Sequence, residues 1–150
     1  MELKARRHKA EDTASAIEMC YENGWTDGLP VIPPTADLVE KMLEAAKLDP
    51  QHQLAFIENR QTKVTAEKVA INAVMAGCKP EYMPVVAAAV EALADPKYGY
   101  HGPATSTGGS AVFMVVNGPI AERLGINGGM NCLGQGTVAN ATLGRALRLI

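Results

Sequence analysis

Between Thr105 and Asn140 the chain alternates glycine-rich polar stretches with one short apolar run. TSTGGS at 105–110 precedes AVFMVVNGP at 111–119, and GINGGMNCLGQGTVANATLG follows at 125–144. Glycine tolerates positive φ and carries no Cβ, so repeated glycines let the backbone approach a ligand closely. The unbroken apolar character of residues 111–116 predicts a central strand. We therefore expect the two glycine-rich loops to flank this strand and to meet around one concave site that is polar but nearly neutral.

Amide and hydroxyl side chains lie among these glycines and are the candidates for binding a substrate. The predicted set is Thr105, Ser106, Thr107, Asn117, Asn127, Gly129, Asn131, Gly136 and Asn140. The element Gly134-x-Gly136 before a capping Thr137 is typical of a helix N-terminus that binds an anion. It lacks the full GxGxxG pattern after a strand, so it is weak support for a dinucleotide, and the cofactor stays unknown.

Apolar periodicity and capping residues predict the remaining elements. The expected helices span residues 11–23, 35–47, 65–77, 80–95, 119–124 and 137–149, and a further strand covers 54–57. At 150 residues, of which 47% are hydrophobic, the chain can bury one core. The expected fold is an α/β single domain over residues 1–150, with helices packed around a small sheet.

Charge and hydropathy argue against a nucleic acid or a membrane as the partner of this chain. A net charge of −2 gives no electrostatic reason to expect a nucleic acid. The basic cluster from Lys4 to Lys9 lies in the first ten residues, where solvated charge and disorder are common. No apolar run approaches the ~20 residues of a membrane helix, and the polar N-terminus lacks the hydrophobic region of a signal peptide. We therefore expect a cytoplasmic protein without a membrane partner.

Cys78 is the leading candidate for a reactive group. The three cysteines, Cys20, Cys78 and Cys132, lack CxxC spacing, which favours reduced thiols over disulfides or a zinc site. Cys78 follows a helix-breaking glycine and precedes Pro80, so its sulfur could lie at the start of the next helix, where the dipole favours thiolate. We expect its pKa to fall below the ordinary ~8.5. The alternative is a small buried hydrophobe at a tight helix junction.

Two further residues complete the predicted catalytic set. Cys132 lies in GGMNCLGQG, where flexible backbone could donate N–H groups to an anion or a thiolate, although it could also be a loop thiol without a role. His101 follows two tyrosines and could shuttle protons near neutral pH, or it could simply be exposed. Asp27 is expected to order a turn rather than to act as an acid or base. Any metal ion would need ligands that converge in space or come from a partner.

The last helix carries an apolar stripe up to the final residue. Leu143, Ala146, Leu147 and Ile150 follow the spacing i, i+3, i+4, i+7 without a capping glycine or a polar tail. The stripe either docks on the core of its own chain or belongs to a subunit whose fold another chain completes. That other chain is either a separately encoded partner or, in a homodimer, a second copy of this one.

Three long motifs resemble an uncharacterised bacterial family. They are GWTDGLPVIPPT at 24–35, VTAEKVAINAVMAGCKPEYMPVVAAAVEAL at 64–93, and VVNGPIAERLGINGG at 115–129 with TVANATLGRALRLI at 137–150. The resemblance covers nearly all of residues 24–150. Members of this family look like companions of the small UGSC (seleno)proteins, named for a selenocysteine-or-cysteine, Gly-Ser-Cys motif.

This chain departs from the family at two places. Relatives commonly continue beyond GRALRLI, which favours a version in which the remainder is a separate polypeptide. Relatives tend to have Thr-Thr-His-Pro where this chain has Thr-Ser-Thr-Gly-Gly at 105–109, so no role for that histidine carries over. The UGSC motif is itself missing, and the resemblance implies association with such chemistry rather than possession of it.

Together these patterns predict one subunit of a hetero-oligomeric enzyme that acts on a small polar or anionic organic molecule. The expected class is a lyase or oxidoreductase that cleaves a carbon–heteroatom bond with the help of a thiol. The alternative is a non-catalytic binding or scaffold subunit that completes the active site of a partner.

Overall fold

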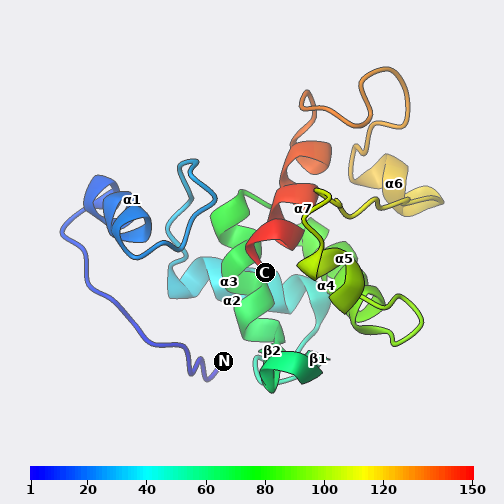
Figure 1. Cartoon of the computed structure of the whole chain (residues 1–150). Helices are drawn as coiled ribbons and strands as arrows, with labels where there is room; N and C mark the ends of the chain where they lie inside the picture. Colours follow the sequence, from blue (N-terminus) through cyan, green and yellow to red (C-terminus); the bar gives the residue numbers. More distant parts are fainter.

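Helix α3 (Ala66–Ala76) lies at the centre of the molecule, and most of its residues are buried. The computed structural model describes residues 1–150. Three helices of similar length surround α3 and share its apolar core with it (Figure 1). They are α2 (Ala36–Ala46), α4 (Met83–Ala94) and α7 (Val138–Leu149). The result is one mostly helical domain of seven helices with a small sheet.

The sheet has only two antiparallel strands, β1 (Gln53–Ile57) and β2 (Thr62–Thr65). A short 3₁₀ turn over Glu58–Arg60 joins them. Leu54 of β1 and Val64 of β2 are buried and belong to the main core. The strand predicted at 54–57 is confirmed. Its partner was not predicted, because TKVT is short and only one of its residues is buried.

Most predicted helices are confirmed, because local capping chemistry defines their ends. Asp12 accepts a hydrogen bond from the backbone of Ser15 and caps α1 (Thr13–Glu22). Thr65 and Thr137 cap α3 and α7 in the same way. The remaining short helices are a 3₁₀ turn at Pro80–Tyr82, α5 (His101–Thr105) in a segment expected to be loop, and α6 (Pro119–Arg123).

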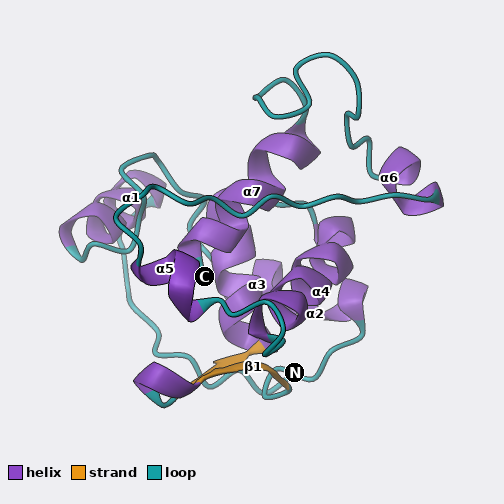
Figure 2. Cartoon of the chain, turned by 45° about the vertical axis from the view of Figure 1, so that its right-hand side comes forward, coloured by secondary structure: helices purple, strands orange, loops and turns teal.

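The central strand predicted at 111–116 is wrong. The predicted single domain with helices packed around a small sheet is confirmed, although it is mostly helical. Residues 111–116 pair with no strand, and no backbone hydrogen bond involves any residue from 109 to 117. The segment crosses beside α7, whereas the only sheet lies at the other end of the molecule, at the bottom of both views (Figures 1 and 2). Its apolar character instead reflects packing on helices. Met114 and Val116 pack against the core, and we name residues 109–117 the unpaired segment.

Two anchors connect the N-terminal third to the helical core. Glu67, at the start of α3, is almost fully buried and accepts hydrogen bonds from the backbone N–H groups of Lys4 (3.1 Å) and Ala5 (2.7 Å). Gln51 donates a third bond to the same carboxylate, from Nε2 at 2.9 Å. We name residues 1–11 the N-terminal arm. The basic cluster of the arm therefore starts at a defined point on the core.

The second anchor is a bidentate ion pair between Arg145 of α7 and Asp27. The guanidinium donates to Oδ2 (3.0 Å) and to Oδ1 (2.8 Å), and it also reaches the carbonyl of Pro30 at 3.0 Å. The hydrogen bonds from Arg145 lower the pKa of Asp27 to about 2. Thr26 and the backbone N–H of Leu29 also bond the Asp27 carboxylate, as expected for a residue that orders a turn. Asp27 is thus committed to holding residues 25–30 on α7.

Candidate functional site

The glycine-rich loop between α6 and α7 is organised by one side chain, Asn140 in the first turn of α7. Its Oδ1 accepts hydrogen bonds from the backbone N–H of Asn127 (2.8 Å) and from Oγ1 of Thr137 (2.7 Å). Its Nδ2 donates to the carbonyls of Asn127 (3.0 Å) and Cys132 (2.8 Å). Four bonds therefore occupy Asn140, and they fold the loop back onto α7.

The other two loop asparagines also bond the loop backbone. Asn127 accepts from the N–H of Gly129 at 2.9 Å and donates to the carbonyl of Met130 at 2.8 Å. Asn131 adopts a left-handed conformation, with φ of 64°, and donates to the carbonyl of Gln135. A Cβ added at Gly134 would lie 2.1 Å from Oδ1 of Asn131. At this position, glycine makes room for a side chain of the loop itself.

The predicted glycines of this loop differ in what they require. Gly136 has a φ of 143°, which L side chains rarely adopt, so a valine there would strain the backbone. A Cβ at Gly129 would make only an ordinary contact, 3.5 Å from Oδ1 of Asn127. The structure therefore brings Asn127, Asn131 and Asn140 together, and their side chains form hydrogen bonds with the backbone of the loop itself. Their use in binding a substrate stays a prediction.

The second predicted loop lies apart from the first. His101 begins α5, and Thr105, Ser106 and Thr107 at the other end of this helix are exposed. Both views show α5 well separated from the loop that leads into α7 (Figures 1 and 2), and no hydrogen bond joins the two regions. Asn117 is exposed and makes no hydrogen bond. The expectation that both loops meet around one site therefore finds no support in the arrangement of the chain.

Cys78 lies between two helices as predicted, one residue after the C-cap of α3 and one residue before the N-cap of the 3₁₀ turn at Pro80–Tyr82. Gly77 has a φ of 91° and ends α3, and the N–H of Cys78 bonds the carbonyl of Ala73 at 2.9 Å. This is the hydrogen-bond pattern of a Schellman motif, which lies at the negative end of the helix dipole. The Cys78 Sγ donates to the carbonyl of Thr142 at 3.4 Å. Burial raises the pKa of Cys78 to about 11, so the expected lowering is wrong.

Cysteine labelling should therefore follow the order of exposure. Cys132 is exposed, whereas Cys20 and Cys78 are buried. With limiting iodoacetamide at neutral pH, mass spectrometry should find Cys132 modified first. Modification of Cys78 should become faster only as the pH rises toward 11, because the thiolate is the nucleophile. Fast labelling of Cys78 near neutral pH in the folded protein would restore it as the reactive group.

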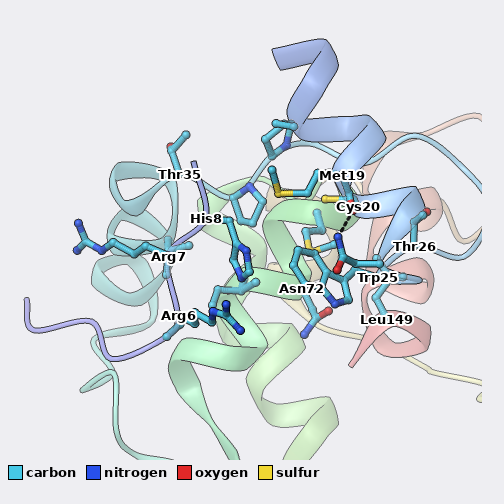
Figure 3. Close-up of a pocket in the computed structure, with 18 of the residues that line it drawn as sticks. Arg6, Arg7, His8, Met19, Cys20, Trp25, Thr26, Thr35, Asn72 and Leu149 are labelled. Atoms are coloured by element: carbon cyan, nitrogen blue, oxygen red, sulfur yellow. Dashed lines mark hydrogen bonds between the residues drawn. The ribbon is translucent and has the colours of Figure 1, made fainter. Parts of the chain in front are cut away.

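A large cavity, not predicted from the sequence, lies between the N-terminal arm, α1 and α3 (Figure 3). Its volume is about 1380 Å³. His8 and the only tryptophan, Trp25, meet edge to face across it, with ring centroids 4.9 Å apart. We name it the arm cavity. The basic cluster and the tryptophan were both visible in the sequence, but nothing local indicates that the arm crosses α3.

A second hollow is smaller and entirely apolar. Its volume is about 210 Å³, and it lies between α4, α7 and the unpaired segment. The walls are formed by Ala89, Ala92, Leu93, Tyr98, Val112, Phe113, Met114, Val115 and Leu147. Leu147 therefore belongs to a wall within this chain, and the apolar stripe of α7 docks largely on the core of its own chain. We name this hollow the apolar groove.

No three His, Cys, Asp or Glu side chains lie close enough together to hold a metal ion. None of the helices has the length and apolar character needed to cross a membrane. The chain matches no protein-family model, no curated protein and no solved structure, so its function is argued from its own residues and geometry.

Proposed function

We propose that the chain is a binding subunit of a larger protein assembly, and that a partner protein adds a strand to the unpaired segment. The observation that carries this proposal is the row of backbone groups from 109 to 117 that make no hydrogen bond within the chain. Extended backbone with free N–H and C=O groups is a template for pairing with another strand.

The side chains of the unpaired segment alternate as they do in a half-buried strand. Met114 and Val116 face the core, while Phe113 and Val115 are 72% and 69% exposed. Exposed apolar side chains next to free backbone groups are unusual on a surface without a partner. A partner strand would satisfy the backbone groups and cover Phe113 and Val115 in the same step.

The charge pattern supports an uncharged partner surface. No Asp, Glu, Lys or Arg occurs from Tyr98 to Ala121, although these residues make up 20% of the chain. A partner strand with Val, Ile, Phe or Thr side chains could pack on this surface without burying an unpaired charge. The proposed partner therefore presents an apolar, uncharged strand.

The resemblance to companions of UGSC-type proteins leads us to rank a second protein subunit above a homodimer. In such an assembly the partner would supply the reactive thiol or selenol, and this chain would shape the site. This corresponds to the scaffold alternative stated from the sequence. It does not depend on Cys78, whose buried thiol is held protonated.

Exposure of Cys132 favours a second candidate function, the thiol-assisted enzyme subunit. Cys132 is the one cysteine that a small polar substrate can reach, and its loop is ordered by the bond between Asn140 and its carbonyl. The reaction class, lyase or oxidoreductase, stays a prediction. If this candidate is correct, Cys132→Ser should abolish turnover by the purified native assembly.

The binding proposal is tested by placing a charge on the unpaired segment. In the assembly purified from the native source, Phe113→Asp should weaken association by several kcal/mol, because burial of an unpaired carboxylate is costly. Met130→Asp is the matched control, since Met130 is 96% exposed and lies in the loop before α7. Native mass spectrometry reports the assembly, and hydrogen exchange reports protection of the amides at 110–117.

Two results would contradict the proposal. The native protein could be a monomer, or it could assemble with rapid exchange at 110–117 and with Phe113→Asp no weaker than Met130→Asp. A homodimer protected at 110–117 would keep the strand pairing and change only the identity of the partner.

A further inference from the structure

We propose that the arm cavity is a binding site for a small organic anion that carries an apolar or aromatic body, such as an aryl-substituted carboxylate. The proposal concerns a different part of the molecule from the unpaired segment and does not rest on the proposed partner. Three properties of the cavity wall lead to it: its charge, its apolar surface and the way in which the arm is held.

The positive charges of the wall are not compensated within the protein. Four cationic side chains line the cavity, and none of them forms an ion pair or donates a side-chain hydrogen bond. They are Arg6, Arg7, Lys68 and Arg148. The carboxylates of the wall are Asp12, Asp27 and Glu67.

Those three carboxylates are all committed elsewhere. Asp12 caps α1, Asp27 pairs with Arg145, and Glu67 accepts three hydrogen bonds from the arm and Gln51. The wall therefore presents free cations and no free carboxylate. An anionic group that enters the cavity would meet charge-assisted donors and no competing negative charge.

An apolar surface lies beside these cations. Met19 of α1, Ile71 and Met75 of α3, and Leu149 of α7 contribute aliphatic or thioether side chains. Trp25 adds an indole face that is already in contact with His8. In Figure 3 His8 and Trp25 are drawn near the middle of the view with Arg6 below, while Arg7 extends away to the left. A ligand that combines an anion with an apolar body would use both kinds of surface.

The arm that carries Arg6 and His8 has a defined position. Glu67 holds the adjacent residues Lys4 and Ala5 through their backbone, at 3.1 and 2.7 Å. Arg6 and His8 therefore follow within three residues of a point where the arm is held on the core, so less conformational entropy is lost when a ligand binds.

Trp25 provides a direct measurement, because it is the only tryptophan of the chain and lines the cavity. The probes are 3-phenylpropionate and its neutral isostere 3-phenylpropanamide, titrated against the full chain with selective excitation of the indole. Phenylpropionate should change the Trp25 emission saturably, with a Kd about tenfold or more below that of the amide, since only the anion gains charge-assisted hydrogen bonds.

Variants show whether the effect belongs to this site. Arg6→Gln and Arg148→Gln should each raise the Kd for phenylpropionate several-fold and leave binding of the amide unchanged. Lys9→Gln is the matched control, since it removes the same charge from the same arm at a residue that does not line the cavity. Phe113→Asp should bind phenylpropionate normally, which separates this test from the test of the partner surface.

Three outcomes would overturn the proposal. Trp25 emission could fail to saturate at millimolar phenylpropionate, or the amide could bind as tightly as the anion. Lys9→Gln could also weaken binding as much as Arg6→Gln, which would make the attraction a diffuse effect of the basic arm.

Discussion

Leu143→Ala is expected to lower the free energy of unfolding by about 2–5 kcal/mol, the usual cost of a cavity left by a buried leucine. Leu143 is 2% exposed and is among the largest fully buried side chains of the core. It lies on α7, which packs on α3 and α4 of the same chain. Packed neighbours enclose the Leu143 side chain, so they can fill the vacated volume only in part and most of the cavity should persist. Urea unfolding followed by circular dichroism measures the change.

Leu133→Ala is the matched control for this variant. Leu133 lies in the loop before α7 and is 83% exposed, so its truncation should change stability by less than about 0.5 kcal/mol. Equal effects of the two substitutions, or a small effect of Leu143→Ala, would mean that α7 does not dock on its own core in solution. The apolar stripe of α7 would then be available to another chain, which is the second of the two alternatives stated from the sequence.

Asn140→Ala is expected to cost about 2–6 kcal/mol, since each of the four hydrogen bonds of its side chain contributes roughly 0.5–1.5 kcal/mol. The bonds join Asn140 to Asn127, Thr137 and Cys132 and close the loop on α7. Hydrogen exchange should show faster exchange of the Asn127 amide, which loses its acceptor. Urea unfolding measures the change in stability.

Two companion variants sharpen this second test. Asn140→Asp keeps an acceptor oxygen and loses the amide donor, so it should retain slow exchange at the Asn127 amide while releasing the carbonyls of Asn127 and Cys132. Asn117→Ala removes an exposed amide without hydrogen bonds and should be neutral. If Asn140→Ala is as neutral as Asn117→Ala, the asparagines of the loop are not engaged with its backbone and are free to serve a ligand.

Elements that depend on neighbours in the chain could be predicted from the sequence. Asp12, Thr65 and Thr137 each precede a helix and bond its first turn, and Gly77 ends α3 with a positive φ. These signals act over three or four residues, so no knowledge of the tertiary structure is needed.

Features that depend on contacts between distant residues could not be predicted. An apolar run of six residues is compatible with a strand or with an extended chain on a helical surface, and only the location of the sheet decides between them for residues 111–116. The direction of the Cys78 sulfur depends on Thr142 of α7, which lies 64 residues further along the chain. The arm cavity depends on Glu67, which lies 62 residues beyond Ala5.

The asparagines of the glycine-rich loop show a different limit. Their abundance among glycines is expected both for a ligand-binding loop and for a loop that satisfies its own backbone. Composition is the same in the two cases, and only the positions of the partners distinguish them. Here every side-chain hydrogen bond of Asn127, Asn131 and Asn140 ends on the loop or on the cap of α7.

The clamp formed by Glu67 determines how freely the arm can change its sequence. Glu67 grips Lys4 and Ala5 by their backbone N–H groups, which every amino acid except proline provides. Side chains at these two positions can therefore be exchanged without loss of the anchor, whereas the carboxylate itself has no substitute of equal reach and charge. The side chains of the arm, and with them the ligand that they recognise, can therefore vary between sequences while the arm stays attached to Glu67.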